Sequence, residues 1–301
     1  MKVAAMNKVK DLSMPNMLFT IMNTVFMLVI CVITLFPVLN VLAVSLSADV
    51  YVYSGSVTFF PRGLQFDSYK KVLSAASIWR SFLNSIIVAG FSCIFSLIFT
   101  SLASYPLAFC EFHGKKIYTF MILLTMWFSG GIIPSFMVMQ KLHLVNTLWA
   151  LIIGPLIVAY HVIILRTFYK SIPVSLVESA YIDGANEFSI LLKIIAPLSK
   201  AALATIALWI IVARWNDFMG PIIYLRDNHK YTLQVVLRDI VLTASYGAYG
   251  VSGTGSAEME SLLPEQIRNA TIMFALAPML LIYPFLQKYF VKGVMLGSIK
   301  E

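Results

Sequence analysis

Residues 82–109, FLNSIIVAGFSCIFSLIFTSLASYPLAF, form one run without Asp, Glu, Lys or Arg. A hydrocarbon core about 30 Å thick is crossed by roughly 20 apolar residues in a helix, so this run is long enough to span a bilayer. Five more stretches meet the same criterion, at about 17–44, 117–139, 147–165, 201–225 and 270–287. The sequence therefore predicts an all-α integral membrane protein with six transmembrane helices, in a single domain over 17–301 after an N-terminal segment 1–16.

The composition of the whole chain agrees with lipid as its main solvent. Hydrophobic residues make up 59% of the 301 residues, charged residues 12%, and the mean hydropathy is +0.85. A soluble domain has about 25% charged residues, so this chain has too few to cover a water-facing surface. The net charge of +8 is spread thinly along the chain. Because no run of five or more Lys and Arg occurs, we expect no nucleic-acid partner.

Cysteine and histidine are too scattered to form a disulfide framework or a metal site. They lie at Cys31, Cys93, Cys110, His113, His143, His161 and His229. No Ser/His/Asp, Cys/His or H-E-x-x-H arrangement is present either, which argues against a membrane enzyme. We therefore expect no catalytic residue, no metal ligand and no cofactor bound by this chain.

The first apolar stretch follows three lysines and ends in small residues at 43–48, as a cleaved signal peptide would. Signal-peptide cores are only about 7–15 residues long, so we predict an uncleaved span at 17–44. With the N-terminus inside, the inner segments hold twelve Lys and Arg residues and the outer segments hold nine. Since cytoplasmic loops are enriched in these residues, we expect both chain ends to be cytoplasmic.

Helix breakers lie in or near several predicted spans: Pro37, Pro106, Gly130-Gly131 with Pro134, Gly154-Pro155 and Gly220-Pro221. Membrane helices tolerate such residues where neighbouring groups satisfy the freed backbone, so we interpret each as a kink. A secondary transporter typically has internal repeats or an intramembrane chain of Asp, Glu and His. The sequence offers neither, and this class is the weaker alternative.

The segment 173–197, PVSLVESAYIDGANEFSILLKIIAP, is too polar to be a span and is patterned as a helix–turn–helix. Pro173 suits a first helical turn, and Ser175 with Glu178 fits a capping box. Asp183-Gly184 predicts a turn, because Gly accepts a positive φ without penalty.

The second helix of this segment has one predicted apolar stripe and ends at Pro197. The stripe recurs at i, i+3, i+4 and i+7, which is helical spacing. Its members are Phe188, Leu191, Leu192 and Ile195. We expect the stripe to lie in the groove of a partner protein. The alternative is an amphipathic hairpin that lies on the membrane surface.

This segment resembles the EAA loop of ABC importer permeases, whose pattern is Glu-Ala-Ala, three residues, Gly, nine residues and Ile-x-Leu-Pro. The matching positions are Glu178, Ala180, Gly184, Ile194 and Pro197, with Ser179 and Ala196 as small departures. The fuller Asp183-Gly184-Ala185 resembles the carbohydrate branch. Two other segments agree: 215–225 is similar to the fifth span of that branch, and 291–300 to the C-terminus of Gram-positive permeases for complex oligosaccharides.

The resemblance implies that the chain is one permease subunit of an ATP-driven oligosaccharide importer in the bacterial cytoplasmic membrane. Its loop would be a cytoplasmic coupling helix lodged in an ATPase. The implied coupling residues are Glu178, Ala180, Asp183, Gly184, Ala185, Phe188 and Pro197. The implied partners are an ATPase dimer, a second and distinct permease and an extracytoplasmic solute-binding protein. An importer of a non-sugar solute is the alternative.

The chain has no G-x-x-x-x-G-K-S/T loop, so ATP and Mg²⁺ would bind to the partner ATPase. Arg214 and Asp217 are clearly intramembrane charges at i, i+3 spacing and are expected to pair. Trp215 and Asn216 beside them supply a ring and an amide, which sugar sites commonly use. We expect these four residues to line the substrate pathway; the alternative is a structural ion pair or a gate.

The outer loop 226–269 has a helix-like stretch, followed by a Tyr/Gly/Ser-rich segment from Ser245 to Ser256 that predicts flexibility. The helix-like positions are Leu233, Val236, Leu237, Ile240 and Val241. By resemblance this face would receive the solute-binding protein; plain surface cover is the alternative.

Overall fold

The computed structural model describes residues 14–247 and 264–298, and these residues form helices joined by turns, without a strand. The elements are α1(Met14–Ser45), α2(Asp49–Tyr53), α3(Asp67–Ser74), α4(Ala76–Phe109), α5(Lys115–Trp127), α6(Ile132–Lys141), α7(Leu148–Ile153), α8(Ala159–Tyr169), α9(Val174–Ile182), α10(Glu187–Ile190), the π-helix η1(Leu191–Ile195), α11(Ala196–Leu198), α12(Lys200–Trp215), α13(Met219–Tyr224), the 3₁₀ helix η2(Asn228–Lys230), α14(Leu233–Gly247) and α15(Pro264–Ser298).

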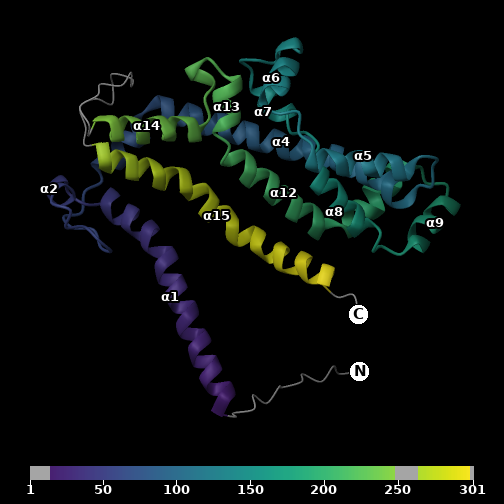
Figure 1. Ribbon diagram of the computed structural model, residues 1–301, viewed down its shortest axis with the longest axis horizontal. Coiled ribbons are helices and arrows are strands. Elements are labelled where there is room, and N and C mark those ends of the chain that lie inside the picture. Colours follow the sequence, from purple (N-terminus) through teal and green to yellow (C-terminus); the bar gives the residue numbers. More distant parts are fainter. Residues whose placement is uncertain (1–13, 248–263, 299–301) are drawn as a thin grey trace.

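Helix α4 is the centre of the arrangement, and α3, α7, α8, α12 and α14 pack against it. Helix α15 packs against α1, α3, α12 and α14. Helix α9 lies at one end of this bundle, whereas α2 and α14 lie at the other (Figure 1). The segment predicted to face an ATPase and the segments predicted to face the outside are therefore at opposite ends.

By length and composition, the described residues hold three helices able to cross a membrane: Met17–Ser45, Ala76–Phe109 and Glu265–Tyr283. Two bent pairs raise the number to five if each pair is one span. The pairs are Lys115–Trp127 with Ile132–Lys141, bent by 114°, and Glu187–Leu198 with Lys200–Trp215, bent by 84°. Six spans thus remain a prediction.

The predicted breakers differ in what they do to the helices. Pro37 and Pro106 lie inside the continuous helices α1 and α4. The predicted span 117–139 is broken before Gly131, whose φ is +84°. The predicted span 147–165 consists of two short helices, α7 and α8, that are separated by residues 154–158. At these two places the interpretation as a kink understated the change, because the backbone leaves the helix altogether.

One polar stripe follows the buried face of α4, against which α8, α12 and α14 pack. Its members are Ser81, Ser85, Ser92, Ser96, Thr100 and Ser104, all buried. The Ser104 hydroxyl donates to the carbonyl of Thr100 at 2.6 Å and also lies 3.1 Å from the carbonyl of Val162 on α8. Small residues of this kind let membrane helices approach closely, which explains how α4 supports so many neighbours.

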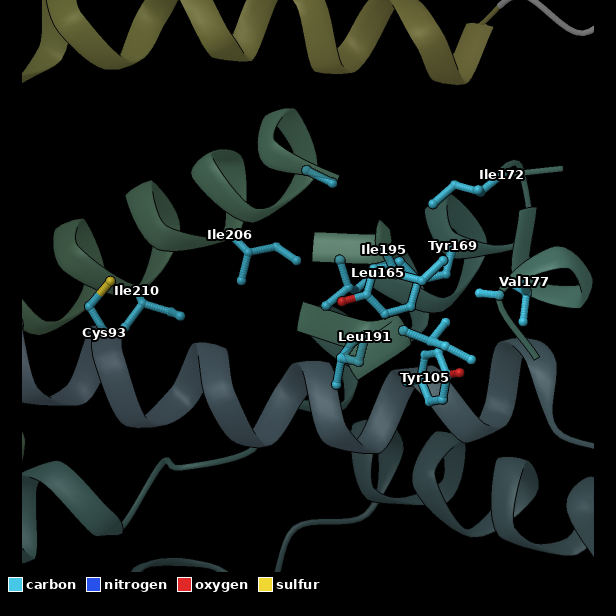
Figure 2. Close-up of a cluster of buried hydrophobic side chains, with 13 residues drawn as sticks. Cys93, Tyr105, Leu165, Tyr169, Ile172, Val177, Leu191, Ile195, Ile206 and Ile210 are labelled. Carbon is cyan, nitrogen blue, oxygen red and sulfur yellow. The ribbon is translucent and has the colours of Figure 1, made fainter. Parts of the chain in front are cut away.

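Two apolar clusters hold α12, one along most of its length and one at its last residue, Trp215. The first contains residues of α4, α8, the 173–197 segment and α12 (Figure 2). The second surrounds Trp215 with residues of α3, α4, α14 and α15. Helix α1 contributes little to either cluster, and most of its apolar side chains from Met17 to Leu39 are exposed.

The helix-like stretch predicted at 233–241 is helical, because it lies in α14. Leu233 and Val235 are buried there. The predicted flexible segment from Ser245 to Ser256 lies mostly outside the described residues.

Candidate functional site

The 173–197 segment has the predicted helix–turn–helix form, made of α9, a turn at 183–186, and α10 with η1 and α11. The turn is closed by the amide of Gly184, which donates to the carbonyl of Tyr181 at 3.0 Å, and by the amide of Ala185, which donates to the carbonyl of Ala180 at 2.9 Å. Gly184 has φ +77°, in the left-handed region. The turn predicted at Gly184 is therefore confirmed, and its positive φ is one that glycine adopts without penalty.

The predicted capping box at Ser175 and Glu178 is wrong. Pro173 occupies the N-cap of α9, and within the described residues no side chain caps this helix. The Ser175 carbonyl instead accepts a hydrogen bond from the Ser179 hydroxyl at 2.8 Å. The side-chain cap is on the second helix, where Asn186 Oδ1 accepts from the amide of Ser189 at 2.8 Å.

The predicted apolar stripe faces two different environments rather than one partner. Leu191 and Ile195 are 4% and 0% exposed and belong to the chain's own core. Phe188 and Leu192 are 65% and 66% exposed. A wide apolar stripe on a short helix can divide between a side that faces the chain's own core and a side that faces away from it. Only the outer half is free for a partner protein.

Pro197 does not end the second helix by itself, because α11 continues to Leu198. The chain then bends at Ser199 by 84° and enters α12. The hairpin therefore lies across the end of α12 and not along it.

The other coupling candidates divide between the surface and the core. Glu178 and Asp183 are exposed, and Ala185 is half-buried at the turn. Ala180 is 6% exposed and packs in the same cluster as Val177. A small residue at 180 allows α9 to lie close against the bundle.

Sequence reasoning missed Glu187, which joins the hairpin to α4. Its carboxylate accepts hydrogen bonds from the Tyr105 hydroxyl of α4 at 2.6 Å and from the Tyr181 hydroxyl of α9 at 2.5 Å. The bond to Glu187 raises the pKa of Tyr181. No spacing pattern in one sequence relates residues 105 and 187, so this contact could be found only in three dimensions.

Arg214 and Asp217 form the predicted ion pair, with Arg214 Nη1 3.2 Å from Asp217 Oδ2. The Asp217 Oδ1 also accepts from the amide of Gly220 at 2.9 Å, which joins α12 to α13. Both charged side chains are about one fifth exposed, at 21% and 22%. They line a cavity of about 410 Å³ that is otherwise bordered by α6, α7 and α13, including Ser135 and Tyr224.

Trp215 and Asn216 do not line this cavity. The Trp215 ring is 4% exposed, and its indole N–H donates to the carbonyl of Ala275 at 3.2 Å. Asn216 is exposed, and its amide donates to the carbonyl of Val212 at 2.9 Å. Of the four pathway candidates, the structure brings Arg214 and Asp217 together at a cavity and places Trp215 in the core.

Removal of the Asp217 carboxylate should destabilise the C-terminal end of α12. In Asp217→Ala, Arg214 loses its charge partner and the amide of Gly220 loses its acceptor, for a combined loss of about 1–3 kcal/mol. Asp217→Asn retains an acceptor for the amide and should lose less. Thermal unfolding of the purified protein in detergent measures both changes. Equal melting temperatures for the wild type and Asp217→Ala would contradict a structural role for the pair.

A family model described as "Binding-protein-dependent transport system inner membrane component" matches residues 73–296, which include α4, the hairpin, the ion pair and most of α15. This chain belongs to that family. The family is the permease component of ABC importers, and its members are inner-membrane transport proteins.

Two curated relatives of this chain are sugar transport permeases of Bacillus subtilis (strain 168). The polygalacturonan/rhamnogalacturonan transport system permease protein YtcP is 40% identical over 290 residues, which cover 95% of this chain and 100% of that protein. The arabinooligosaccharides transport system permease protein AraQ is 28% identical over 94% of this chain and 96% of that protein.

A solved structure of an ABC importer has the same fold as this chain. A chain of a bacterial ABC transporter involved in the import of the acidic polysaccharide alginate aligns with a TM-score of 0.83 and 32% sequence identity. The alignment covers 92% of this chain and 98% of that chain. The arrangement of helices described above is therefore that of an importer permease.

Proposed function

We propose that this chain is a permease subunit of an ATP-driven importer for oligosaccharides or polysaccharide fragments. The 40% identity to the polygalacturonan/rhamnogalacturonan permease over nearly the whole of both chains is the observation that carries the proposal. The relative that imports arabinooligosaccharides and the structural neighbour that imports alginate support the same class of cargo. The chain would form half of the translocation pathway.

The hairpin 173–197 would be the contact with a separate ATPase, which binds ATP and Mg²⁺. The side of the hairpin that faces away from the bundle carries apolar side chains that the chain itself does not cover. Ile182 is 87% exposed, and Phe188 and Leu192 project from the second helix. Glu178, Asp183 and Pro197 add exposed positions on the same hairpin. An apolar surface of this kind on a helix–turn–helix suits the groove of another protein.

The hairpin would lie on the cytoplasmic side, where an ATPase can reach it, and both chain ends would be cytoplasmic as well. If α12 crosses the bilayer, the 84° bend at Ser199 places the preceding helix along the membrane surface. The opposite end of the bundle holds α2 and α14 (Figure 1) and would face a solute-binding protein. A second, distinct permease would complete the pathway.

The cavity at Arg214 and Asp217 would belong to the substrate pathway. Arg214 lies about 20 Å along the axis of α12 from Lys200, at 1.5 Å per residue. If Lys200 is at the cytoplasmic surface, Arg214 would lie in the outer half of the bilayer. Ser135, Tyr224 and the ion pair supply polar groups on a largely apolar wall. Polar groups placed on an apolar wall are typical of sites that bind small polar molecules.

The test is copurification of the tagged protein from native membranes in mild detergent, followed by uptake measurements with the assembled complex. We expect an ATPase and a second permease to copurify, and ATP-dependent uptake of an oligosaccharide in proteoliposomes. Recovery of this chain alone, under conditions that keep other complexes intact, would contradict the proposal. Uptake of a non-sugar solute instead of oligosaccharides would correct the cargo and leave the importer class standing.

A further inference from the structure

The cytoplasmic end of α4 is a junction at which three other segments are attached by polar side chains. Arg166 of α8 donates through Nε to the carbonyl of Leu107 at 3.1 Å. Lys115 of α5 donates through Nζ to the carbonyl of Cys110 at 2.9 Å. The third attachment is the carboxylate of Glu187, which receives the Tyr105 and Tyr181 hydroxyls. The last carbonyls of a helix have no partner within it, so the two cations also satisfy this end of α4.

The apolar contacts at this junction explain why the hairpin stays attached but not how its orientation is fixed. Figure 2 shows Tyr105 of α4 in one cluster with Val177 and Leu191 of the hairpin. Apolar contacts are non-directional, so they resist separation more than they resist sliding or rotation. Hydrogen bonds weaken steeply when their angles change. Bonds from one carboxylate to two different helices therefore restrain the orientation of these helices relative to each other.

Glu187 is suited to this task by its chemistry. An ionised carboxylate has two oxygens and only accepts hydrogen bonds, so it can receive both tyrosine hydroxyls at once. Hydrogen bonds to a charged acceptor are also about twice as strong as neutral ones. Tyr105 is 5% exposed, which holds the donor of α4 in one place. The carboxylate thus bridges a fixed group on α4 and a group on the first helix of the hairpin.

We propose that Glu187 is the positioning residue that locks the coupling hairpin to the cytoplasmic end of α4. A displacement of the hairpin by the ATPase is then passed to α4, and through α4 to α8 and α12, which pack along it. This inference rests on the proposed coupling function of the hairpin. It adds that the Tyr105–Glu187–Tyr181 bridge, and not the apolar cluster alone, transmits the motion.

The test compares transport per ATP hydrolysed in the assembled complex, reconstituted in proteoliposomes. The variants are Glu187→Ala, Tyr105→Phe and the double variant, with Glu111→Gln as a matched control. Glu111 is an exposed carboxylate at the same end of α4. We expect ATPase activity to persist in Glu187→Ala while transport per ATP falls about three- to tenfold. Tyr105→Phe should show the same direction, and Glu111→Gln should match the wild type.

The double variant separates a bridge from two independent effects. If Tyr105 acts through Glu187, the double variant should be no worse than Glu187→Ala alone. Tyr105→Phe removes only the hydroxyl and retains the buried ring, so the complex with this variant should still assemble. It can therefore be measured even if Glu187→Ala does not assemble. Wild-type transport per ATP in Tyr105→Phe and in any Glu187→Ala complex that assembles would overturn the inference and leave the proposed function intact. Failure of the wild type to bind an ATPase would overturn both.

Discussion

Gly184→Arg should abolish ATP-driven transport while leaving the fold of the chain intact. Gly184 has φ +77°, and within the described chain no heavy atom lies within 4 Å of the position a Cβ would take. The substitution therefore meets no obstacle inside the subunit, and its intrinsic cost is the left-handed backbone, about 1–2 kcal/mol. In the assembled importer, the same position would lie where the hairpin meets the ATPase, and a long charged side chain would prevent that approach. Transport should fall to background.

Two controls separate this effect from backbone strain. Gly184→Ala has the same backbone penalty but almost no bulk, so it should retain most transport. Gly55→Arg places the same side chain at φ +63°, again with no atom of the described chain within 4 Å, but beside α2 at the opposite end of the bundle. Copurification of the ATPase and uptake in proteoliposomes measure the result. If Gly184→Arg retains both, the coupling role of the hairpin is wrong.

The sequence was sufficient for features that depend on local chemistry. The turn at Gly184 follows from the conformational freedom of glycine. The pairing of Arg214 with Asp217 follows from their separation of three residues, although α12 ends at Trp215 and Asp217 lies in the link to α13. Both depend on residues within a few positions of one another. The helix–turn–helix form of 173–197 follows for the same reason, since two short periodic stretches flank a turn signal.

What could not be predicted depends on contacts between distant segments. Periodicity places Phe188, Leu191, Leu192 and Ile195 on one stripe, but it does not say which protein covers that stripe; here the chain's own core covers Leu191 and Ile195. Hydropathy averages over a window, so the apolar stretch 147–165 was predicted as one span; Gly154-Pro155 marked the position of a kink, but not that the backbone leaves the helix between α7 and α8. The bridge through Glu187 joins residues 82 positions apart.

Trp215 is the candidate whose sequence-based role and observed position differ most. A ring next to an intramembrane ion pair suggested a stacking surface for a sugar. In the structure the ring lies edge-on to Phe82, with centroids 5.8 Å apart, and packs with Ile78, Leu233 and Ala270. Because successive side chains on a helix point about 100° apart, Arg214 can line the cavity while Trp215 points into the bundle.

Trp215→Ala should therefore act on stability and not on substrate affinity. Loss of a buried tryptophan typically destabilises a protein by about 3–5 kcal/mol, and the carbonyl of Ala275 would also lose its donor. Trp215→Phe keeps most of the apolar volume and should lose much less. Thermal unfolding in detergent gives the stability, and the KM for uptake below the unfolding temperature gives the affinity. A packing role requires a lower Tm with an unchanged KM; a raised KM with an unchanged Tm would return Trp215 to the substrate pathway.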